Sequence, residues 1–174
     1  MNKIKKIGIL AVCCLVLTGC GENVYEQGVK QLESENYEAA VTSFEKAVEK
    51  EKNLADSYRG LGIAYWELQE YENAKDALEK SIEHGTEETA TIYSILGNCE
   101  LELQNAEEAV AYYEKVLSAE NVDESLRQDV EFNVIVAYEQ MKDLDTAREK
   151  LEEYLGKYPE DEAAAKEAEF LETR

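Results

Sequence analysis

Few residues of this chain have side chains suited to chemistry. It contains one His, His84, and four Cys among 174 residues. With this single His the sequence does not supply a Ser-His-Asp triad. A zinc site with two His ligands cannot be assembled from one imidazole either. His84 precedes Gly85 at the expected end of a helix, where a cation and a left-handed glycine complete the helix terminus. We therefore interpret His84 as structural.

Two short segments are superficially similar to ligand-binding loops. Gly60 and Gly62 lie inside a helical pattern and lack the third glycine of a phosphate loop. Asp143 and Asp145 lack the glycine and the later Glu of a calcium loop. We predict no catalytic residue, no metal and no cofactor, and therefore a protein that is not an enzyme.

The charge balance excludes one class of partner. Acidic residues outnumber basic ones by 39 to 18, which gives a net charge of −21. Affinity for nucleic acids comes largely from Lys and Arg, so we expect no nucleic acid partner. One Pro and nine Gly, with abundant Ala, Glu and Leu, favour helices over turn-rich sheets.

The N-terminus has the pattern of an export signal. A basic head, Met1 to Lys6, precedes an apolar run from Ile7 to Leu17 that is too short to span a bilayer comfortably. The next residues, ending in Gly19 and Cys20, resemble the lipobox of bacterial lipoproteins. That resemblance implies a signal peptide at 1–19, lipidation (for instance by palmitate) of Cys20, and a short tether at 20–24.

A lipid-anchored Cys20 has consequences for location and for the other cysteines. Two or more acyl chains hold a protein stably on a membrane, so we expect an extracytoplasmic protein on the cell membrane or outer membrane. Cys13 and Cys14 would leave with the signal peptide, so Cys99 remains alone. We predict a small buried thiol there and no disulfide framework.

A repeat organises the rest of the chain. Gly28, Gly62 and Gly97 are 34 and 35 residues apart. Two further columns repeat in step with them: Ala40, Ala74, Ala109 and Ala147, and Phe44, Leu78, Tyr113 and Leu151. Several columns at one period indicate a repeat architecture. A unit of this length with two helical patterns resembles the tetratricopeptide repeat.

The resemblance implies an all-α, right-handed solenoid. Its four units would cover 25–161, at about 21–54, 55–89, 90–123 and 128–161, and a capping helix would cover 162–174. Small residues at helix crossings let paired helices approach closely. Four additional residues before the last unit predict an extended helix. Asn36 and Asn105 are predicted N-caps, with Glu108 completing a capping box.

In this family the first helices of the units line a concave face that holds a partner. The corresponding positions are Tyr25, Val29, Arg59, Ile63, Trp66, Asn98, Phe132 and Val136. Members that grip a C-terminal carboxylate use Lys, Arg and Asn there, and only Arg59 and Asn98 qualify, so we do not expect that clamp. Trp66 is the predicted anchor. For Leu32, Trp66 and Leu101, packing against a neighbouring first helix is an equal alternative.

Two functions fit these residues. The first is an interaction adaptor or scaffold in the cell envelope, anchored to the membrane by its lipid. Its partner would be another envelope or secreted protein or peptide with apolar anchors and basic residues, since the groove combines apolar residues with an acidic rim. The alternative is capture of a secreted peptide or other apolar ligand in the same groove.

Overall fold

The computed structural model describes residues 23–173, and this part of the chain is folded into helices without strands. The helices in this part are α1 (Val24–Glu33), α2 (Tyr37–Glu49), α3 (Leu54–Glu67), α4 (Tyr71–Glu83), α5 (Ala90–Glu102), α6 (Ala106–Ser118), α7 (Glu124–Gln140), α8 (Leu144–Lys157) and α9 (Glu162–Glu172). Within these residues no helix is long and apolar enough to cross a membrane. Cys20 and the predicted signal peptide lie outside the described residues.

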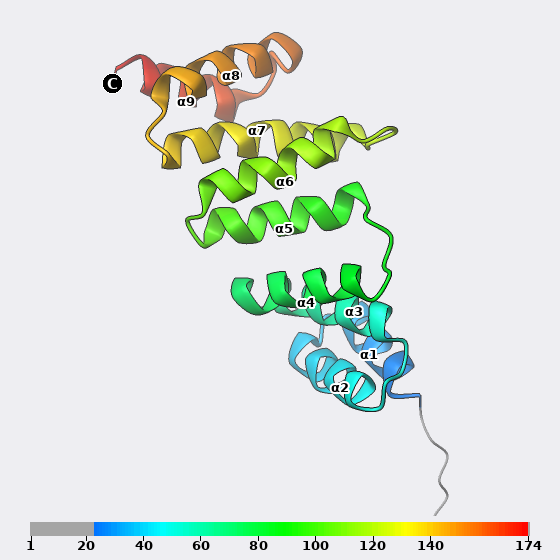
Figure 1. The fold of residues 1–174 in the computed structure, drawn as a ribbon. Helices are drawn as coiled ribbons and strands as arrows, with labels where there is room; N and C mark the ends of the chain where they lie inside the picture. The colour runs from blue at the N-terminus through cyan, green and yellow to red at the C-terminus, as the bar shows by residue number, and fades with distance from the viewer. Residues whose placement is uncertain (1–22, 174) are drawn as a thin grey trace, which may run out of the picture.

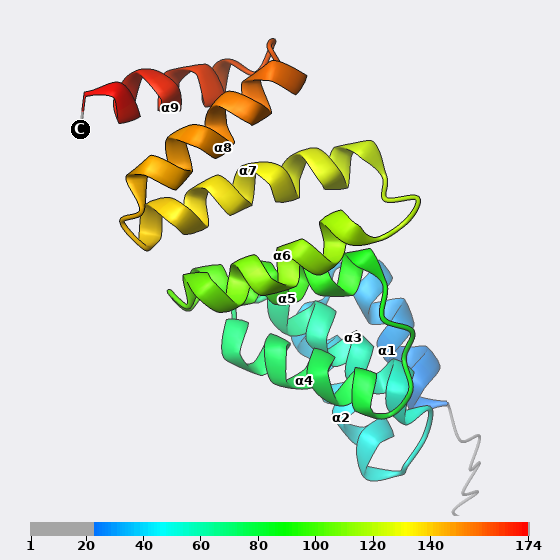
Figure 2. The ribbon, with the colours of Figure 1, turned by 45° about the horizontal axis from the view of Figure 1, so that its top comes forward.

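The helices stack in chain order, so that the chain winds along one direction from α1 to α9 (Figure 1). Each helix packs mainly against the helix before it and the helix after it. The odd-numbered helices also meet, α1 with α3 and α5 with α7. This arrangement, also visible after rotation (Figure 2), is a solenoid of helix pairs and confirms the predicted all-α fold class.

Glycines allow the paired helices to approach closely. A Cβ atom on Gly97 would lie 2.5 Å from Cε1 of Tyr113, and one on Gly62 would lie 2.5 Å from Cγ of Leu78. Gly28 and Gly60 both face the ring of Phe44, which is 1% exposed. The repeated glycines are therefore points where an aromatic or aliphatic side chain of the second helix fills the space of the missing side chain.

The core runs through the whole stack. Leu78 of α4 belongs to the same buried cluster as Leu96 of α5, Tyr113 of α6 and Val130 of α7. A second cluster joins Ile135, Leu151 and the α9 residues Ala164 and Leu171. Helix α9 therefore covers apolar surface that α7 and α8 would otherwise expose at the C-terminal end.

The turns inside the helix pairs have one recurring geometry. Glu35, Gln69, Gln104 and Lys142 follow the first helices and have φ values of 59°, 60°, 65° and 62°. After α5, the N–H of Asn105 donates to the carbonyl of Glu100, and the N–H of Gln104 donates to that of Leu101. These bonds close the helix end in a Schellman arrangement without a glycine.

Asn36 and Asn105 are the N-cap residues of α2 and α6, as predicted, but their side-chain caps and the capping box with Glu108 do not form. Neither Asn36 nor Asn105 makes a side-chain bond to the first turn of its helix. The Nδ2 of Asn105 instead donates to the Glu100 carboxylate at 2.8 Å, so its side chain turns back across the tight turn. Side-chain caps do form at Asp123, Asp143 and Asp161, whose carboxylates accept bonds from the first-turn amides.

Helix α7 is 17 residues long, whereas α5 has 13, so the additional residues before the last unit extend a helix as predicted. The added N-terminal turn is formed by residues 124–127 and directly precedes Gln128 and Asp129. The residue that replaces the repeated glycine, Ile135, is fully buried against α8 and α9.

Candidate functional site

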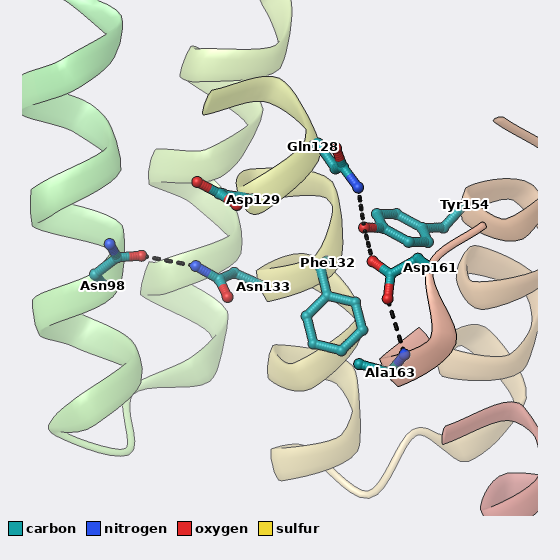
Figure 3. Close-up of a pocket in the computed structure, with 8 residues that line it drawn as sticks. All are labelled: Asn98, Gln128, Asp129, Phe132, Asn133, Tyr154, Asp161 and Ala163. Atoms are coloured by element: carbon teal, nitrogen blue, oxygen red, sulfur yellow. Dashed lines mark hydrogen bonds between the residues drawn. The ribbon is translucent and has the colours of Figure 1, made fainter. Parts of the chain in front are cut away.

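We define the first-helix face as the face formed by α1, α3, α5 and α7, and a cleft lies in it near the C-terminal end. It has a volume of about 360 Å³ and brings together residues of α5, α7, α8 and the start of α9 (Figure 3). Its lining residues are Asn98, Gln128, Asp129, Phe132, Asn133, Tyr154, Asp161 and Ala163. We call it the α5–α7 cleft.

Two asparagine side chains form one wall of the α5–α7 cleft. Asn98 Oδ1 accepts a bond from Asn133 Nδ2 at 3.0 Å and another from the Tyr113 hydroxyl at 2.8 Å. Burial raises the pKa of Tyr113, so its hydroxyl remains a donor at neutral pH. The Asn98 amide NH₂ and the Asn133 amide oxygen then have no hydrogen-bond partner among the described residues. One donor group and one acceptor are available there for a ligand.

The opposite wall is a chain of hydrogen bonds that joins α7, α8 and α9 (Figure 3). Gln128 Nε2 donates to the Tyr154 hydroxyl at 3.0 Å, and that hydroxyl donates to Asp161 Oδ2 at 2.7 Å. Asp161 also accepts the backbone N–H of Ala163 at 3.0 Å. The Tyr154 hydroxyl bond, more than any other contact, holds the pKa of Asp161 below its usual range. Asp161 is therefore a fixed negative group at neutral pH.

Phe132 and Asp129 give the cleft an apolar and an acidic element. The Phe132 ring is half-buried and meets the Tyr154 ring edge-on, with 5.6 Å between centroids. Asp129, one turn earlier on α7, is exposed. The combination can hold an apolar side chain against Phe132 and a basic one near Asp129, while the two amides bond to backbone groups.

A second cavity lies further along α7, between its C-terminal end and α9. Its volume is about 270 Å³, and it is lined by Val136, Glu139, Gln140, Leu144, Phe170 and Leu171. We call it the α7–α9 cavity. Of the predicted groove residues, Asn98 and Phe132 line the α5–α7 cleft. Val136 lines the α7–α9 cavity instead, because α9 packs beside it.

The predicted groove residues of the first two units are placed differently. A third buried cluster, the N-terminal core cluster, consists of Ala40, Phe44, Leu61, Ala64 and Ala77. Tyr25, Val29 and Leu32 pack against it, and the Tyr25 ring centroid lies 6.0 Å from that of Phe44. Packing therefore accounts for much of the surface of these three side chains. Leu101, whose role was left open, likewise packs against the central core.

The remaining three predicted residues belong to α3. Arg59 is exposed and pairs with Asp56 of its own helix at 2.8 Å. Ile63 and Trp66 are half-buried, and the Trp66 ring lies 5.4 Å from the ring of Tyr71. None of the three lines the α5–α7 cleft or the α7–α9 cavity.

Sequence reasoning missed Asn133, Gln128 and Asp129. Helical periodicity offered a signal for Asn133, which lies three residues before Val136 and therefore one turn away on the same face. Gln128 and Asp129 lie at the start of the last repeat unit, where Gln128 bonds to Tyr154 of α8, and Asp161 and Ala163 reach the cleft through the docking of α9.

No group in the described residues points to catalysis. Within this part of the chain, no cluster of three or more His, Cys, Asp or Glu residues could hold a metal ion. Cys99 is fully buried, and burial raises the pKa of its thiol to about 12. The thiolate form is therefore negligible at neutral pH. His84 ends α4, followed by Gly85 with φ of 96°, and its ring stacks on Tyr58.

The fold defines a helical-repeat protein whose first-helix face carries a cleft lined by polar and aromatic residues. Family models give the class a name: a tetratricopeptide repeat model matches residues 54–121, a TPR repeat model matches residues 32–69, and a further tetratricopeptide repeat model matches residues 129–161. The chain therefore contains tetratricopeptide repeats.

One curated relative supports the same assignment. The TPR repeat-containing protein YsoA of Bacillus subtilis (strain 168) is 26% identical over 96 residues, which are 55% of this chain and 29% of that protein. The matched region spans less than a third of the relative's length.

Solved structures show the same fold. MamA 41-end from Desulfovibrio magneticus RS-1 superposes with a TM-score of 0.73 at 18% identity, over 87% of this chain and 82% of that one. YrrB, described as a TPR protein with an unusual peptide-binding site, superposes with a TM-score of 0.70 at 21% identity, over 85% of this chain and 74% of that one. At these identities the likeness concerns the fold.

Proposed function

We propose that this protein is a membrane-anchored adaptor of the cell envelope that binds an extended segment of a partner protein in the α5–α7 cleft. The observation that carries the proposal is the pair Asn98 and Asn133, which hold each other in place and present an amide donor and an amide acceptor beside Phe132. A peptide backbone offers the matching acceptor and donor.

The partner segment has a defined chemistry in this proposal. An apolar side chain packs on Phe132, and a Lys or Arg side chain lies near Asp129, which is exposed at the cleft. The net charge of −21 favours approach of a basic segment. Support from fold relatives comes from YrrB, whose description includes a peptide-binding site.

A crosslinking experiment tests the cleft. A photoreactive residue replaces Ala163, which is exposed and lines the cleft, in the full chain in its native cells, and adducts are identified by mass spectrometry. We expect one dominant envelope protein, with yield lost in Phe132→Ala and Asn133→Ala variants by tenfold or more, as for truncated hot spots. A photoreactive residue at exposed Glu107 of α6 is the control for random collisions. Adducts equal at both positions would refute binding in the cleft.

Small secreted peptides as the only adducts would favour ligand capture over an adaptor. Trp66→Ala is the matched aromatic truncation outside the cleft. It should leave the yield unchanged if binding is confined to α5, α7 and the start of α9.

The membrane anchor is tested separately. The sequence support is the basic head, the apolar run and Cys20. Mass spectrometry of the mature protein should show an N-terminal Cys20 carrying acyl chains, and the protein should sediment with membranes. Cys20→Ser should abolish acylation and move the protein out of the membrane fraction; an unchanged membrane fraction would refute lipid anchoring through Cys20.

A further inference from the structure

A groove lies between α2 and α4, with α3 as its floor. Its volume is about 430 Å³, within the range of about 300–1,000 Å³ that is typical of ligand sites. Tyr58, Leu61, Tyr65 and Ala77 form much of its surface, and Glu45 and Lys80 lie at its rim. We call it the α2–α4 groove. It shares no lining residue with the α5–α7 cleft.

The next groove along the stack, between α4 and α6, is filled by a side chain of the protein itself. Tyr112 of α6 packs against the central core, and its ring stacks on that of Tyr93 with 6.1 Å between centroids. Its hydroxyl donates to Glu79 Oε1 of α4 at 3.2 Å. Lys115 Nζ lies 5.4 Å from the centroid of the Tyr112 ring and 4.4 Å from that of Tyr93. One tyrosine side chain thus contacts a ring, a cation and a carboxylate at once.

The α2–α4 groove has the same surroundings without that tyrosine. Three of its residues have the same type as their equivalents one repeat later: Glu45 and Glu79, Tyr58 and Tyr93, and Lys80 and Lys115. Lys80 Nζ lies 5.9 Å from the centroid of the Tyr58 ring, which repeats the cation–π arrangement. The position of Tyr112 is occupied by Ala77, whose side chain is one methyl group. The groove is therefore open where the Tyr112 ring lies in the next repeat.

Two neighbouring aromatic side chains leave this space open. The Tyr65 hydroxyl donates to Glu45 Oε1 at 3.3 Å and forms one wall of the groove. A carboxylate accepts several hydrogen bonds, so Glu45 can accept a second hydroxyl. The His84 ring stacks on Tyr58 with 5.3 Å between centroids, but His84 does not line the groove. Glu45 and Lys80 are exposed, so a ligand can reach both.

The groove between α6 and α8 has different chemistry. It contains a cavity of about 240 Å³ that is lined, among others, by Glu131 and Lys150. These two residues occupy the positions equivalent to Tyr93 and Tyr112. The tyrosine on which a second ring would stack is therefore replaced there by a carboxylate, and only the α2–α4 groove combines the ring, the cation and the carboxylate with an open space.

We propose that the α2–α4 groove binds a tyrosine side chain of a partner protein, in the place that Tyr112 takes between α4 and α6. The ring of the bound tyrosine lies on Tyr58 with Lys80 beside it, and its hydroxyl donates to Glu45. Two further acidic residues line the groove and are exposed, Glu49 and Asp76, and they favour a basic residue next to that tyrosine. This second site is independent of the α5–α7 cleft.

The test uses the full chain and N-acetyl-tyrosine amide as the probe. The methyl groups of Val48 and Leu61, which line the groove, are followed by NMR, because an aromatic ring beside them shifts their signals. We expect a saturable shift with a dissociation constant on the order of 1–10 mM. N-acetyl-phenylalanine amide, which lacks the hydroxyl, should bind about threefold or more weakly. N-acetyl-leucine amide should give no saturable shift.

A self-filling variant assigns the shift to this groove. Ala77→Tyr supplies the chain's own ring at the position equivalent to Tyr112. The variant should lose binding of the probe, and it should unfold at a higher urea concentration than the unmodified chain because the new ring covers apolar surface. Ala111→Tyr is the same substitution at an exposed position of α6 that does not line the groove, and it should bind the probe like the unmodified chain.

A second pair of variants tests the hydroxyl contact without filling the groove. Glu45→Ala removes the exposed acceptor and should bind the tyrosine amide no more tightly than the phenylalanine amide. Glu49→Ala removes the same charge from the same helix and should keep the preference for tyrosine. Loss of the preference in both variants would show that only the negative charge of the rim matters.

Three results would overturn the inference: no saturable shift with the tyrosine amide, equal binding of the tyrosine and leucine amides, or unchanged binding in Ala77→Tyr. Self-association of the unmodified chain that Ala77→Tyr abolishes, measured by sedimentation, would assign the groove to a second copy of the chain and refute a partner tyrosine. The crosslinking at Ala163 reports on different residues, so a failure here would leave the adaptor proposal standing.

Discussion

Replacing Gly97 by Ala tests the idea that missing side chains set the spacing of the helix pairs. A Cβ atom there would lie 2.5 Å from Cε1 and 2.7 Å from Cδ1 of Tyr113. Carbon atoms in contact prefer about 3.5–4.0 Å. The Tyr113 ring is fully buried and its hydroxyl is bonded to Asn98, so it cannot move aside without cost.

The size of the effect follows from three contributions. Overpacking a well-filled core costs about 1–3 kcal/mol. Displacement of the ring would also weaken the bond to Asn98, at about 0.5–1.5 kcal/mol. Ala is favoured over Gly inside a helix by about 1 kcal/mol, which opposes both. We expect Gly97→Ala to lower the free energy of unfolding by about 1–3 kcal/mol.

Gly156 provides the matched control. It lies near the end of α8, and a Cβ atom there would meet nothing within 4 Å. The same substitution at this position gains only helix propensity, so we expect a stabilisation of about 0.5–1 kcal/mol. Urea denaturation of both variants, compared at an unchanged m-value, measures the difference. Equal shifts for the two variants would refute the close approach at Gly97.

Three further predictions concern the thiol, a turn and the last cap. Burial raises the pKa of the Cys99 thiol to about 12, so this thiol should escape alkylation in the folded chain and react in denaturant. Peptide mapping measures the labelling, and labelling at the rate of an exposed thiol would contradict the burial of Cys99. Gln104→Gly should raise the free energy of unfolding by about 0.5–1 kcal/mol in urea titrations, because residue 104 has φ of 65°; a destabilised variant would show that the backbone is not strained there. Asp161→Ala should speed amide hydrogen exchange in α9 roughly fivefold relative to α3. The pKa of Asp161 is lowered in the folded chain, mainly by the bond from the Tyr154 hydroxyl, so its stabilising effect is present above the pKa of the unfolded chain and is lost as the pH falls through the folded pKa. The protection of α9, which is its exchange rate relative to the intrinsic rate at each pH, should therefore fall on acidification, and unchanged protection would argue against this cap.

The periodic part of the fold could be predicted because it rests on local steric demands. Gly28, Gly62 and Gly97 recur at the places where Phe44, Leu78 and Tyr113 enter the partner helix. Each of these pairs lies within one unit of the repeat, so the spacing of residue types carries the information. The all-α solenoid follows from those columns.

The turns were less predictable, since two local solutions compete for the same residues. An asparagine before a helix can cap it, which was the expectation for Asn105. In the structure Asn105 is the N-cap residue of α6, and its carbonyl accepts the N–H of Ala109. Its N–H and its side chain, however, bond to the preceding helix end, at the Glu100 carbonyl and the Glu100 carboxylate. The residue type alone does not determine whether the side chain bonds to the helix before the turn or to the helix after it.

The candidate site was predictable only where a residue's neighbours come from its own unit or the next. Asn98 and Phe132 were identified from repeat positions and share one cleft. Asp161 and Ala163 reach the same cleft through the docking of α9, which depends on burial of Ala164 and Leu171. Tyr25 and Val29 occupy equivalent repeat positions, yet they pack on the N-terminal core.

Helix α9 contributes both to the stability of the stack and to the shape of its first-helix face. Its apolar residues Ala164 and Leu171 are buried and end the core, as a terminal helix of a solenoid must. Its first residues complete the wall of the α5–α7 cleft, and Leu171 lines the α7–α9 cavity. A helix that only shielded the core would need none of the polar contacts between Asp161, Tyr154 and Gln128. Those contacts tie the start of α9 to the N-terminal part of α7, so a change in the sequence at the start of α9 should alter the α5–α7 cleft while the repeats stay the same.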